Sequence, residues 1–157
     1  MIEGQVTANR EAIVQVTVQG PTGDEVEIDA VVDTGFDGWL TLPAELVKRL
    51  SLTWRRRGSA LLADGNEILF DVYDGAVIWD GRTRRIPVDV AETAPLLGMG
   101  MLQAHRLVMD VERRGAVKIT RLVRRRPSYA VVVPHISATR GVSISEPGST
   151  SSTRRLS

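Results

Sequence analysis

Alternation of hydrophobic and polar residues near the start of the chain predicts β-strands. Residues 14–18 read Val-Gln-Val-Thr-Val, a pattern typical of a strand with one buried face. Residues 25–32 alternate in the same way, and the Gly-Pro-Thr-Gly-Asp segment at 20–24 between the two runs is typical of a turn. The pattern therefore predicts a hairpin over 12–32 whose second strand leads into Asp33.

The next segments predict another strand and a helix. Residues 40–42 continue as a strand, and Pro43 is well placed as the first residue of a helix that runs to Leu50. We interpret residues 54–59, which include three consecutive arginines, as a basic connection. An arginine run of this kind is more typical of a solvated surface than of a nucleic-acid site.

Two Asp-Gly pairs predict hairpin turns in the middle of the chain. Asp64-Gly65 stands between strand-like flanks within residues 60–68, which favours a tight type I′ turn. A long strand region follows over 69–79. Asp80-Gly81 then predicts a second turn, from which the chain returns as a strand over 82–90.

The last patterned segments complete a strand-rich domain. After a loop come Leu96-Leu97-Gly98, and residues 99–106 predict a short helix that Gly100 weakens. Residues 107–111 and 116–119 predict a terminal hairpin. Taken together, the elements predict a mostly β, single-domain protein with one or two short helices.

Charge and composition both change near Thr120. The formal net charge of the whole sequence is +1, yet residues 1–120 hold 13 Lys and Arg against 18 Asp and Glu. Residues 121–157 hold seven Arg and one Glu, and they contain too few apolar residues to offset the entropy of ordering. We predict a folded domain over 1–122 and a basic, Ser- and Arg-rich, disordered tail over 123–157. The alternatives for this tail are a nucleic-acid arm or a partner-binding segment.

Composition also narrows the possible chemistry. The chain has no cysteine, which excludes disulfides, thiol catalysis and cysteine-based zinc sites. His105 and His135 are thirty positions apart, and we interpret them as surface or packing residues, so no metal or other cofactor is expected. Neither a signal peptide nor an apolar run of membrane-spanning length is visible. The expected location is the cytoplasm, without a membrane partner.

The candidate chemistry centres on Asp33-Thr34-Gly35. Three apolar residues, 30–32, carry the chain inward to a carboxylate, which must be hydrogen-bonded, paired or protonated if it is buried. The Thr34 hydroxyl can donate and accept, and Gly35 allows close approach of another backbone segment. Taken alone, the tripeptide also fits an ordinary turn in which Asp33 caps its own backbone.

This segment resembles the active-site loop of aspartic proteases in the single-domain form of the retroviral proteases, and it is most similar to the bacterial retroviral-like members. The resemblance covers roughly residues 10–120 because the elements come in the same order. A hairpin delivers Asp-Thr-Gly, and a glycine-tipped flap hairpin, two apolar residues with a glycine, a short helix and a terminal strand follow. The resemblance implies a retropepsin-like β-barrel that is active as a twofold homodimer on peptide or protein substrates.

One Asp-Thr-Gly supplies one carboxylate, whereas the aspartic protease mechanism needs two. One ionised aspartate removes a proton from a water molecule, and the other, protonated, polarises the scissile carbonyl. Asp29 lies too far along its strand to share that water with Asp33, and Asp37 lies on the same short turn without twofold symmetry. A twofold dimer that brings Asp33 against its symmetry mate solves this geometry.

The resemblance also implies roles for individual residues. Thr34 would hydrogen-bond across the dimer axis, and Asp37 would bind the substrate main chain. The flap tip would close over the peptide, and Leu97 would line a subsite for apolar side chains. The implied catalytic residues are Asp33, Thr34 and Gly35, and the implied substrate-binding residues are Asp37, Asp64, Gly65, Leu97 and Gly98.

Two departures from the family pattern fall at this site. Phe36 stands where viral and pepsin-like aspartic proteases carry Ala, Ser or Thr, so a hydroxyl that could support the carboxylate is missing. Met99-Gly100 stands where viral members have Arg followed by Asp or Asn, so Asp37 loses its usual basic partner.

Two other functions remain as alternatives. The first is a non-catalytic dimeric module that binds peptides or proteins and keeps the protease fold. The second is an enzyme that acts on sugars through paired carboxylates, which is supported only by the number of Asp residues.

Overall fold

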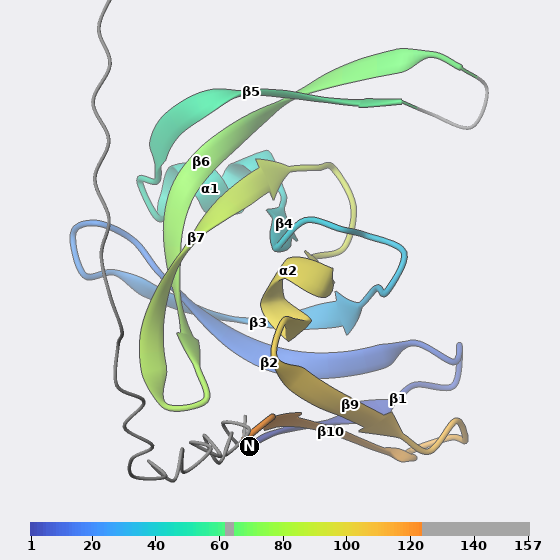
Figure 1. Ribbon diagram of the computed structural model, residues 1–157. Helices are drawn as coiled ribbons and strands as arrows, with labels where there is room; N and C mark the ends of the chain where they lie inside the picture. Colours follow the sequence, from blue (N-terminus) through green and yellow to red (C-terminus); the bar gives the residue numbers. More distant parts are fainter. Residues whose placement is uncertain (62–64, 124–157) are drawn as a thin grey trace, which may run out of the picture. The chain divides into compact units, whose positions relative to one another are not determined.

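The protein consists mostly of strands in the computed structural model, which describes residues 1–61 and 65–123 (Figure 1). The helices described are α1 (Ala44–Arg49) and α2 (Met99–Leu102). The strands described are β1 (Ile2–Val6), β2 (Ala12–Gln19), β3 (Glu25–Val32), β4 (Leu40–Leu42), β5 (Thr53–Leu61), β6 (Glu67–Trp79), β7 (Arg82–Val90), β8 (Leu96–Leu97), β9 (His105–Met109) and β10 (Ala116–Arg121). The prediction of a mostly β protein with one or two short helices is confirmed.

Six of these strands close into a barrel. Backbone pairing joins β2 to β3, β3 to β8, β8 to β4, β4 to β7, β7 to β6, and β6 back to β2. The core is mainly aliphatic, as the low aromatic content of 4% requires. Its buried side chains include Val14, Val16, Val18, Ala30, Leu40, Leu42, Val77, Val88 and Leu97. The predicted single-domain β-barrel is therefore confirmed for the described residues.

The β2–β3 hairpin forms as the alternating pattern predicts. Strand β2 buries every second residue from Ala12 to Val18, and β3 buries Ile28 and Ala30. These apolar faces point into the barrel because side chains alternate between the two faces of a strand. The last residues of β3, Val31 and Val32, pair in parallel with β8, so the strand leads directly into Asp33 from the interior of the sheet.

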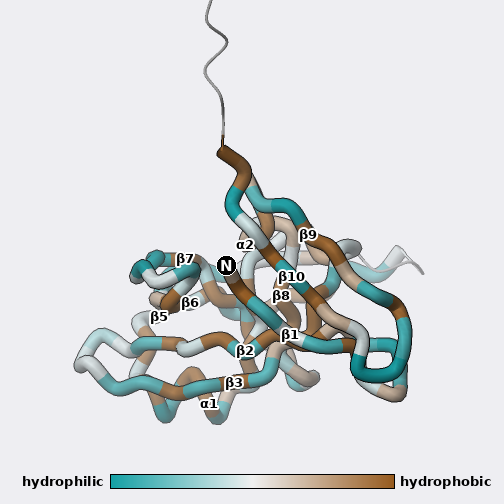
Figure 2. The backbone as a smooth tube through the Cα atoms, turned by 90° about the horizontal axis from the view of Figure 1, so that it is seen from below, coloured by the Kyte–Doolittle hydropathy of each residue, from teal (hydrophilic) through white to brown (hydrophobic). Residues whose placement is uncertain are grey.

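Three strands extend the sheet outward from β2. Strand β1 pairs with both β2 and β10, and β10 pairs with β9, which forms the outer edge. Figure 2 shows β9 and β10 side by side, with hydrophobic segments in both. The predicted terminal hairpin is confirmed, although β9 begins at His105. The pattern did not predict β1, in which polar residues and Gly4 leave only Val6 fully buried.

Strand β5 corrects one prediction from the sequence. Residues 54–59 belong to this strand and are not a connection; they pair with the first half of β6 to form an arm. Nearly all of their side chains are exposed, so neither face of the strand needs apolar residues and no alternation appears. Ion pairs along the arm join Arg55 to Asp74 at 3.1 Å and Arg57 to Asp71 at 3.5 Å. The arginine run therefore lies on a solvated two-stranded ribbon.

The turns and helix ends agree with the sequence only in part. Asp80 and Gly81 both have positive φ, at 49° and 73°, between the paired residues Trp79 and Arg82, so this predicted two-residue turn is confirmed. Helix α1 begins at Ala44, with Pro43 as its cap, and not at the proline itself. Helix α2 ends at Leu102, before the predicted end at residue 106, because Gln103 is extended and Ala104 has φ 62°.

The remaining predictions about domain organisation fall on other parts of the chain. The predicted boundary at 122/123 lies at the end of the described residues, and the tail from residue 124 to residue 157 lies outside them. Within the described residues, no helix is long and apolar enough to cross a membrane.

Candidate active site

Asp33 is held in position by its own backbone at the end of β3. Its peptide N–H donates to the Leu97 carbonyl oxygen at 2.9 Å, which continues the parallel pairing of β3 with β8. Two residues earlier in the chain, the Val31 N–H donates to the Pro95 carbonyl oxygen at 2.9 Å. The buried sheet therefore delivers the carboxylate to the start of a loop, residues 33–39, that runs to β4 (the Asp33 loop).

The Asp33 side chain is half-buried and makes a local hydrogen bond. Its Oδ1 accepts from the Gly35 N–H at 2.9 Å, and its main-chain carbonyl accepts from the Phe36 N–H at 3.3 Å. These bonds form the self-capping turn that the sequence also allowed. No other hydrogen bond to this carboxylate is found among the described residues, and Thr34 and Gly35 are exposed beside it. The carboxylate thus keeps acceptor capacity toward solvent or a second molecule.

The start of α2 clamps the other side of the Asp33 loop. The N–H groups of Gly98, Met99 and Gly100 donate to the carbonyl oxygens of Trp39, Phe36 and Gly38, respectively, at 3.0, 2.8 and 2.8 Å. Together with the bond from Asp33 to Leu97, these contacts fix the loop from both ends. The Leu96-Leu97-Gly98 segment was singled out from the sequence by a family resemblance. In the structure, the backbone of this segment binds the backbone of the Asp33 loop.

The glycines of this clamp make room for Phe36. A Cβ atom on Gly98 would lie 2.5 Å from both the Gly38 carbonyl oxygen and Cδ1 of Phe36. A Cβ on Gly38 would lie 2.3 Å from Cζ of Phe36. The phenyl ring therefore occupies space that two glycines leave open. Phe36, which departs from the family pattern, is a packing residue here and offers no hydroxyl to Asp33.

Asp37 and Asp89 form an acidic edge next to the Asp33 loop. Asp37 is exposed, whereas Asp89 is half-buried on β7, and its Oδ2 lies 3.2 Å from where a Cβ on Gly38 would be. Burial raises the pKa of Asp89, the nearby Arg56 lowers it and the negative charge of Asp37 raises it further. Sequence reasoning missed Asp89, because a polar residue between Val88 and Val90 is expected on the solvent-exposed face of a strand.

Two of the substrate-binding residues implied by the sequence are buried. The Leu97 side chain is fully buried in the core, and Gly98 is buried against the Asp33 loop. Neither presents a side-chain surface in the described chain, and the subsite lined by Leu97 stays a prediction. Their contribution is positional, through the carbonyl of Leu97 and the N–H of Gly98.

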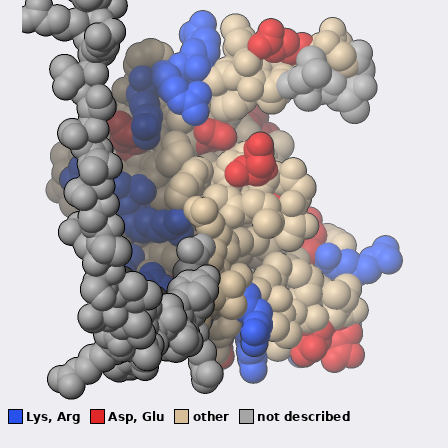
Figure 3. Space-filling view, viewed as in Figure 1, with Lys and Arg blue, Asp and Glu red and all other residues tan. Residues whose placement is uncertain are grey.

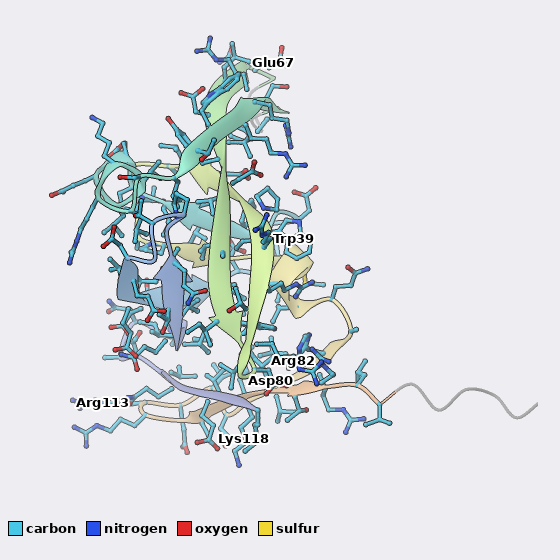
Figure 4. The ribbon with its side chains drawn as sticks, turned by 90° about the vertical axis from the view of Figure 1, so that its left-hand side faces the viewer. Trp39, Glu67, Asp80, Arg82, Arg113 and Lys118 are labelled. Atoms are coloured by element: carbon cyan, nitrogen blue, oxygen red, sulfur yellow. The ribbon has the colours of Figure 1, made fainter. Side chains whose placement is uncertain are left out.

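The β5–β6 arm extends over the Asp33 loop. Figure 1 shows the end of the arm above the body, and Figure 4 shows Glu67, near that end, above Trp39. Figure 3 shows a hollow between arm and body. Gly65, at the end of the arm, is exposed and has φ 85°. Asp64 lies outside the described residues, so the predicted type I′ turn at Asp64-Gly65 stays a prediction.

The described residues offer no clear metal site. No group of three or more His, Asp or Glu side chains in this part of the chain could hold a metal ion. His105 packs against Trp79, and its ring nitrogens contact Trp79 Nε1 and the Gln103 carbonyl, as a packing role requires. His135 lies outside the described residues.

Comparisons with known proteins yield distant structural likenesses. No family model matches the chain, and a search of curated proteins finds no match. EIAV protease in complex with an inhibitor is 20% identical, with a TM-score of 0.45 over 58% of this chain and 84% of that chain. A retropepsin-like aspartic protease from Rickettsia conorii is 14% identical, with a TM-score of 0.45 over 77% of this chain and 90% of that chain. At these scores neither likeness carries an argument about this chain, and the proposals below rest on its own geometry.

Proposed function

We propose that the chain is one subunit of a homodimeric aspartic endopeptidase, which hydrolyses peptide bonds with a water molecule activated by two Asp33 carboxylates. The observation that carries the proposal is the double clamp on the Asp33 loop. The peptide group of Asp33 is bonded to Leu97, and residues 98–100 bind the rest of the loop. Such a clamp holds a half-exposed carboxylate in one position beneath an extended arm, which is what preorganised acid–base chemistry needs.

The proposed reaction uses one proton shared between the two carboxylates. The ionised Asp33 accepts a proton from the water as its oxygen attacks the scissile carbonyl carbon, and the protonated Asp33 donates its proton to the carbonyl oxygen. As the tetrahedral intermediate collapses, one of its hydroxyl groups returns a proton to the ionised Asp33, the C–N bond breaks, and the leaving amine takes a proton from the protonated Asp33, so that one proton remains on the dyad. Two like charges this close cannot both ionise, so cleavage should fall at both low and high pH.

The free edge of β9 supports the dimer. In the described sheet, β9 pairs only with β10, so its outer backbone N–H and C=O groups are available to a second chain. Val108 on this strand is 52% exposed. A twofold axis along this edge would join β9 to its mate and bury such apolar side chains. In that dimer the exposed Thr34 hydroxyl would bond across the axis.

The substrate would lie between the Asp33 loop and the arm. Gly35 and Asp37 are exposed on the loop side and would bind the peptide main chain. Gly65 on the arm, together with Asp64, would close over the peptide and exclude water. Asp89 beside Asp37 adds a second carboxylate to the same side of the substrate.

The second candidate is a non-catalytic dimeric module that binds peptides through the same hollow. The observation that favours it is the lack of side-chain support for Asp33. Its carboxylate accepts from the Gly35 N–H, and Phe36 supplies no hydroxyl. This candidate predicts peptide binding without cleavage.

Cleavage of an apolar peptide library by wild type and by Asp33→Asn, with and without a chelator, separates the two candidates. Wild type should cleave with or without chelator, and Asp33→Asn should remain a folded dimer without cleavage, because Asn keeps the shape of Asp but cannot accept the proton. Binding of the library by both proteins with no cleavage by either would favour the module. Equal cleavage by both proteins would end the aspartic protease proposal.

A further inference from the structure

A cavity rich in arginine lies away from Asp33. It has a volume of about 410 Å³ and lies between the β6–β7 turn, the segment after α2 and the end of β10. Figure 4 shows Asp80 and Arg82 at this turn, beside β10, and Trp39 further along the same side of the hairpin. Side chains that line the cavity include Trp79, Arg82, Arg84, His105, Arg121 and Leu122.

The three arginines of this cavity are not neutralised by ion pairs. Among the described residues, no carboxylate lies within ion-pair distance of Arg82, Arg84 or Arg121. The positive charge of Arg121 helps to lower the pKa of Asp80, but that carboxylate is bonded to the amino group of Met1. In the arm, by contrast, Arg55 and Arg57 each form an ion pair with an aspartate. The cavity therefore gathers positive charge without an internal anion.

Arg84 is the most constrained of the three. Its Nη1 donates to the Met101 carbonyl oxygen at 3.2 Å, and its guanidinium carbon lies 4.4 Å from the centre of the Trp39 ring. Burial lowers the pKa of Arg84, and the positive charge of Arg121 lowers it further. The two guanidinium groups thus lie close enough to repel each other, and an anion between them would remove that repulsion.

His105 packs against Trp79 in the cavity wall. Trp79 Nε1–H can only donate, so Nε2 of His105 accepts that bond at 3.2 Å. The Gln103 carbonyl can only accept, so Nδ1 donates to it at 2.9 Å. Both ring nitrogens are therefore engaged in hydrogen bonds within the protein. The wall formed by Trp79, His105 and Leu122 is consequently suited to an uncharged organic group.

We propose that this cavity binds a small organic phosphate, whose phosphate group is held by Arg82, Arg84 and Arg121 and whose organic part lies against Leu122, over the nearly buried Trp79. Guanidinium groups bind phosphate through paired N–H donors, and Arg84 has only Nη1 engaged in a hydrogen bond. The volume falls in the range of small-molecule pockets, roughly 300–1,000 Å³, so there is room beyond the phosphate itself. The proposal does not depend on peptide hydrolysis.

The tryptophans provide a site-specific readout in the full-length protein. We would titrate ¹⁵N-labelled protein with phenyl phosphate, inorganic phosphate or uncharged benzyl alcohol and follow the indole N–H signals. Phenyl phosphate should shift the Trp79 signal saturably, and the Trp39 signal through Arg84, whereas Trp54, whose indole donates to Asp71 in the arm, should not respond. Inorganic phosphate should bind more weakly, and benzyl alcohol should not bind.

Three variants, each of which removes one positive charge, identify the groups that bind the phosphate. Arg82→Gln and Arg121→Gln should each weaken phenyl phosphate binding by about tenfold or more, because each removes charge-assisted hydrogen bonds. Arg85→Gln is the control, since Arg85 is an exposed neighbour on β7 that does not line this cavity, and its affinity should be unchanged. No shift of Trp79 at millimolar phenyl phosphate, or equal affinity in all three variants, would overturn the proposal. Equal affinity for inorganic and phenyl phosphate would overturn the claim that the cavity also binds the organic group.

Discussion

The Asp33 loop and the β5–β6 arm face each other across the hollow in Figure 3, and they are built in opposite ways. The loop is bonded through its backbone to residues 97–100 and packed around Phe36. The arm is a two-stranded ribbon in which most of the described side chains are exposed, and its ion pairs join solvated groups. Such exposed pairs contribute little to stability, about 0–1 kcal/mol each.

Because of this difference, the two regions should respond differently to substitution. Substitutions in the loop should disturb the packed domain, because its atoms touch the core on several sides. Substitutions near the end of the arm should leave the domain folded, because few buried contacts depend on it. The proposed endopeptidase would use this combination, with a fixed Asp33 loop and an arm that closes over the peptide.

The largest expected effect is that of Gly98→Ala. Its Cβ would meet the Gly38 carbonyl oxygen at 2.5 Å and the Phe36 carbonyl oxygen at 2.7 Å, and backbone atoms can move only if the loop moves. We expect the free energy of unfolding to fall by about 2–3 kcal/mol, measured by urea denaturation. An unchanged midpoint would show that the loop is not tightly clamped.

A smaller effect is expected for the matched substitution in the arm, Gly65→Ala. No described atom lies within 4 Å of the added methyl group, so only the φ of 85° causes strain. We expect a loss of about 1–2 kcal/mol at most, and a value below that of Gly98→Ala, in the same denaturation experiment. A loss equal to that of Gly98→Ala would remove the contrast between arm and loop.

The smallest effect concerns Asp89 and depends on pH. Burial raises the pKa of this carboxyl above its unfolded value of 3.8, so the folded state binds more protons than the unfolded state between the two values. The charged form therefore costs stability once the pH rises through the folded pKa. Asp89→Asn should raise the melting temperature at neutral pH, and this gain should shrink as the pH falls through the folded pKa toward 3.8 and be lost below that value. A gain that is the same at every pH would contradict this explanation.

The sequence predicted the elements whose pattern reflects one buried face. The β2–β3 hairpin shows alternation because one face of each strand fills the barrel, and Asp80-Gly81 forms its turn because both residues take positive φ. Asp33 was identified for the same reason, since a buried strand leads directly into it. The fold and the position of the candidate carboxylate were therefore readable from local pattern and element order.

Other features could not be predicted because they depend on tertiary contacts. Strand β5 has no buried face, so its arginines resemble a loop. Leu97 was expected to line a substrate subsite, and its burial through the parallel pairing of β8 with β3 could not be predicted from the sequence. Arg84 and Arg121 meet only because β7 and β10 lie near each other in the fold. The proximity of these two arginines cannot be inferred from their spacing along the chain.

The central claim, that two Asp33 side chains form one catalytic site across a dimer, is tested most directly by mixing subunits. Wild type at fixed concentration would be mixed with increasing amounts of Asp33→Asn under conditions in which subunits exchange, and cleavage of an apolar peptide would be followed. At equal amounts about a quarter of the dimers would be wild type in both subunits, so the cleavage rate should fall to about half. A large excess of Asp33→Asn should nearly abolish cleavage. A cleavage rate that stays constant while mixed dimers form would show that one Asp33 suffices, and would contradict the account.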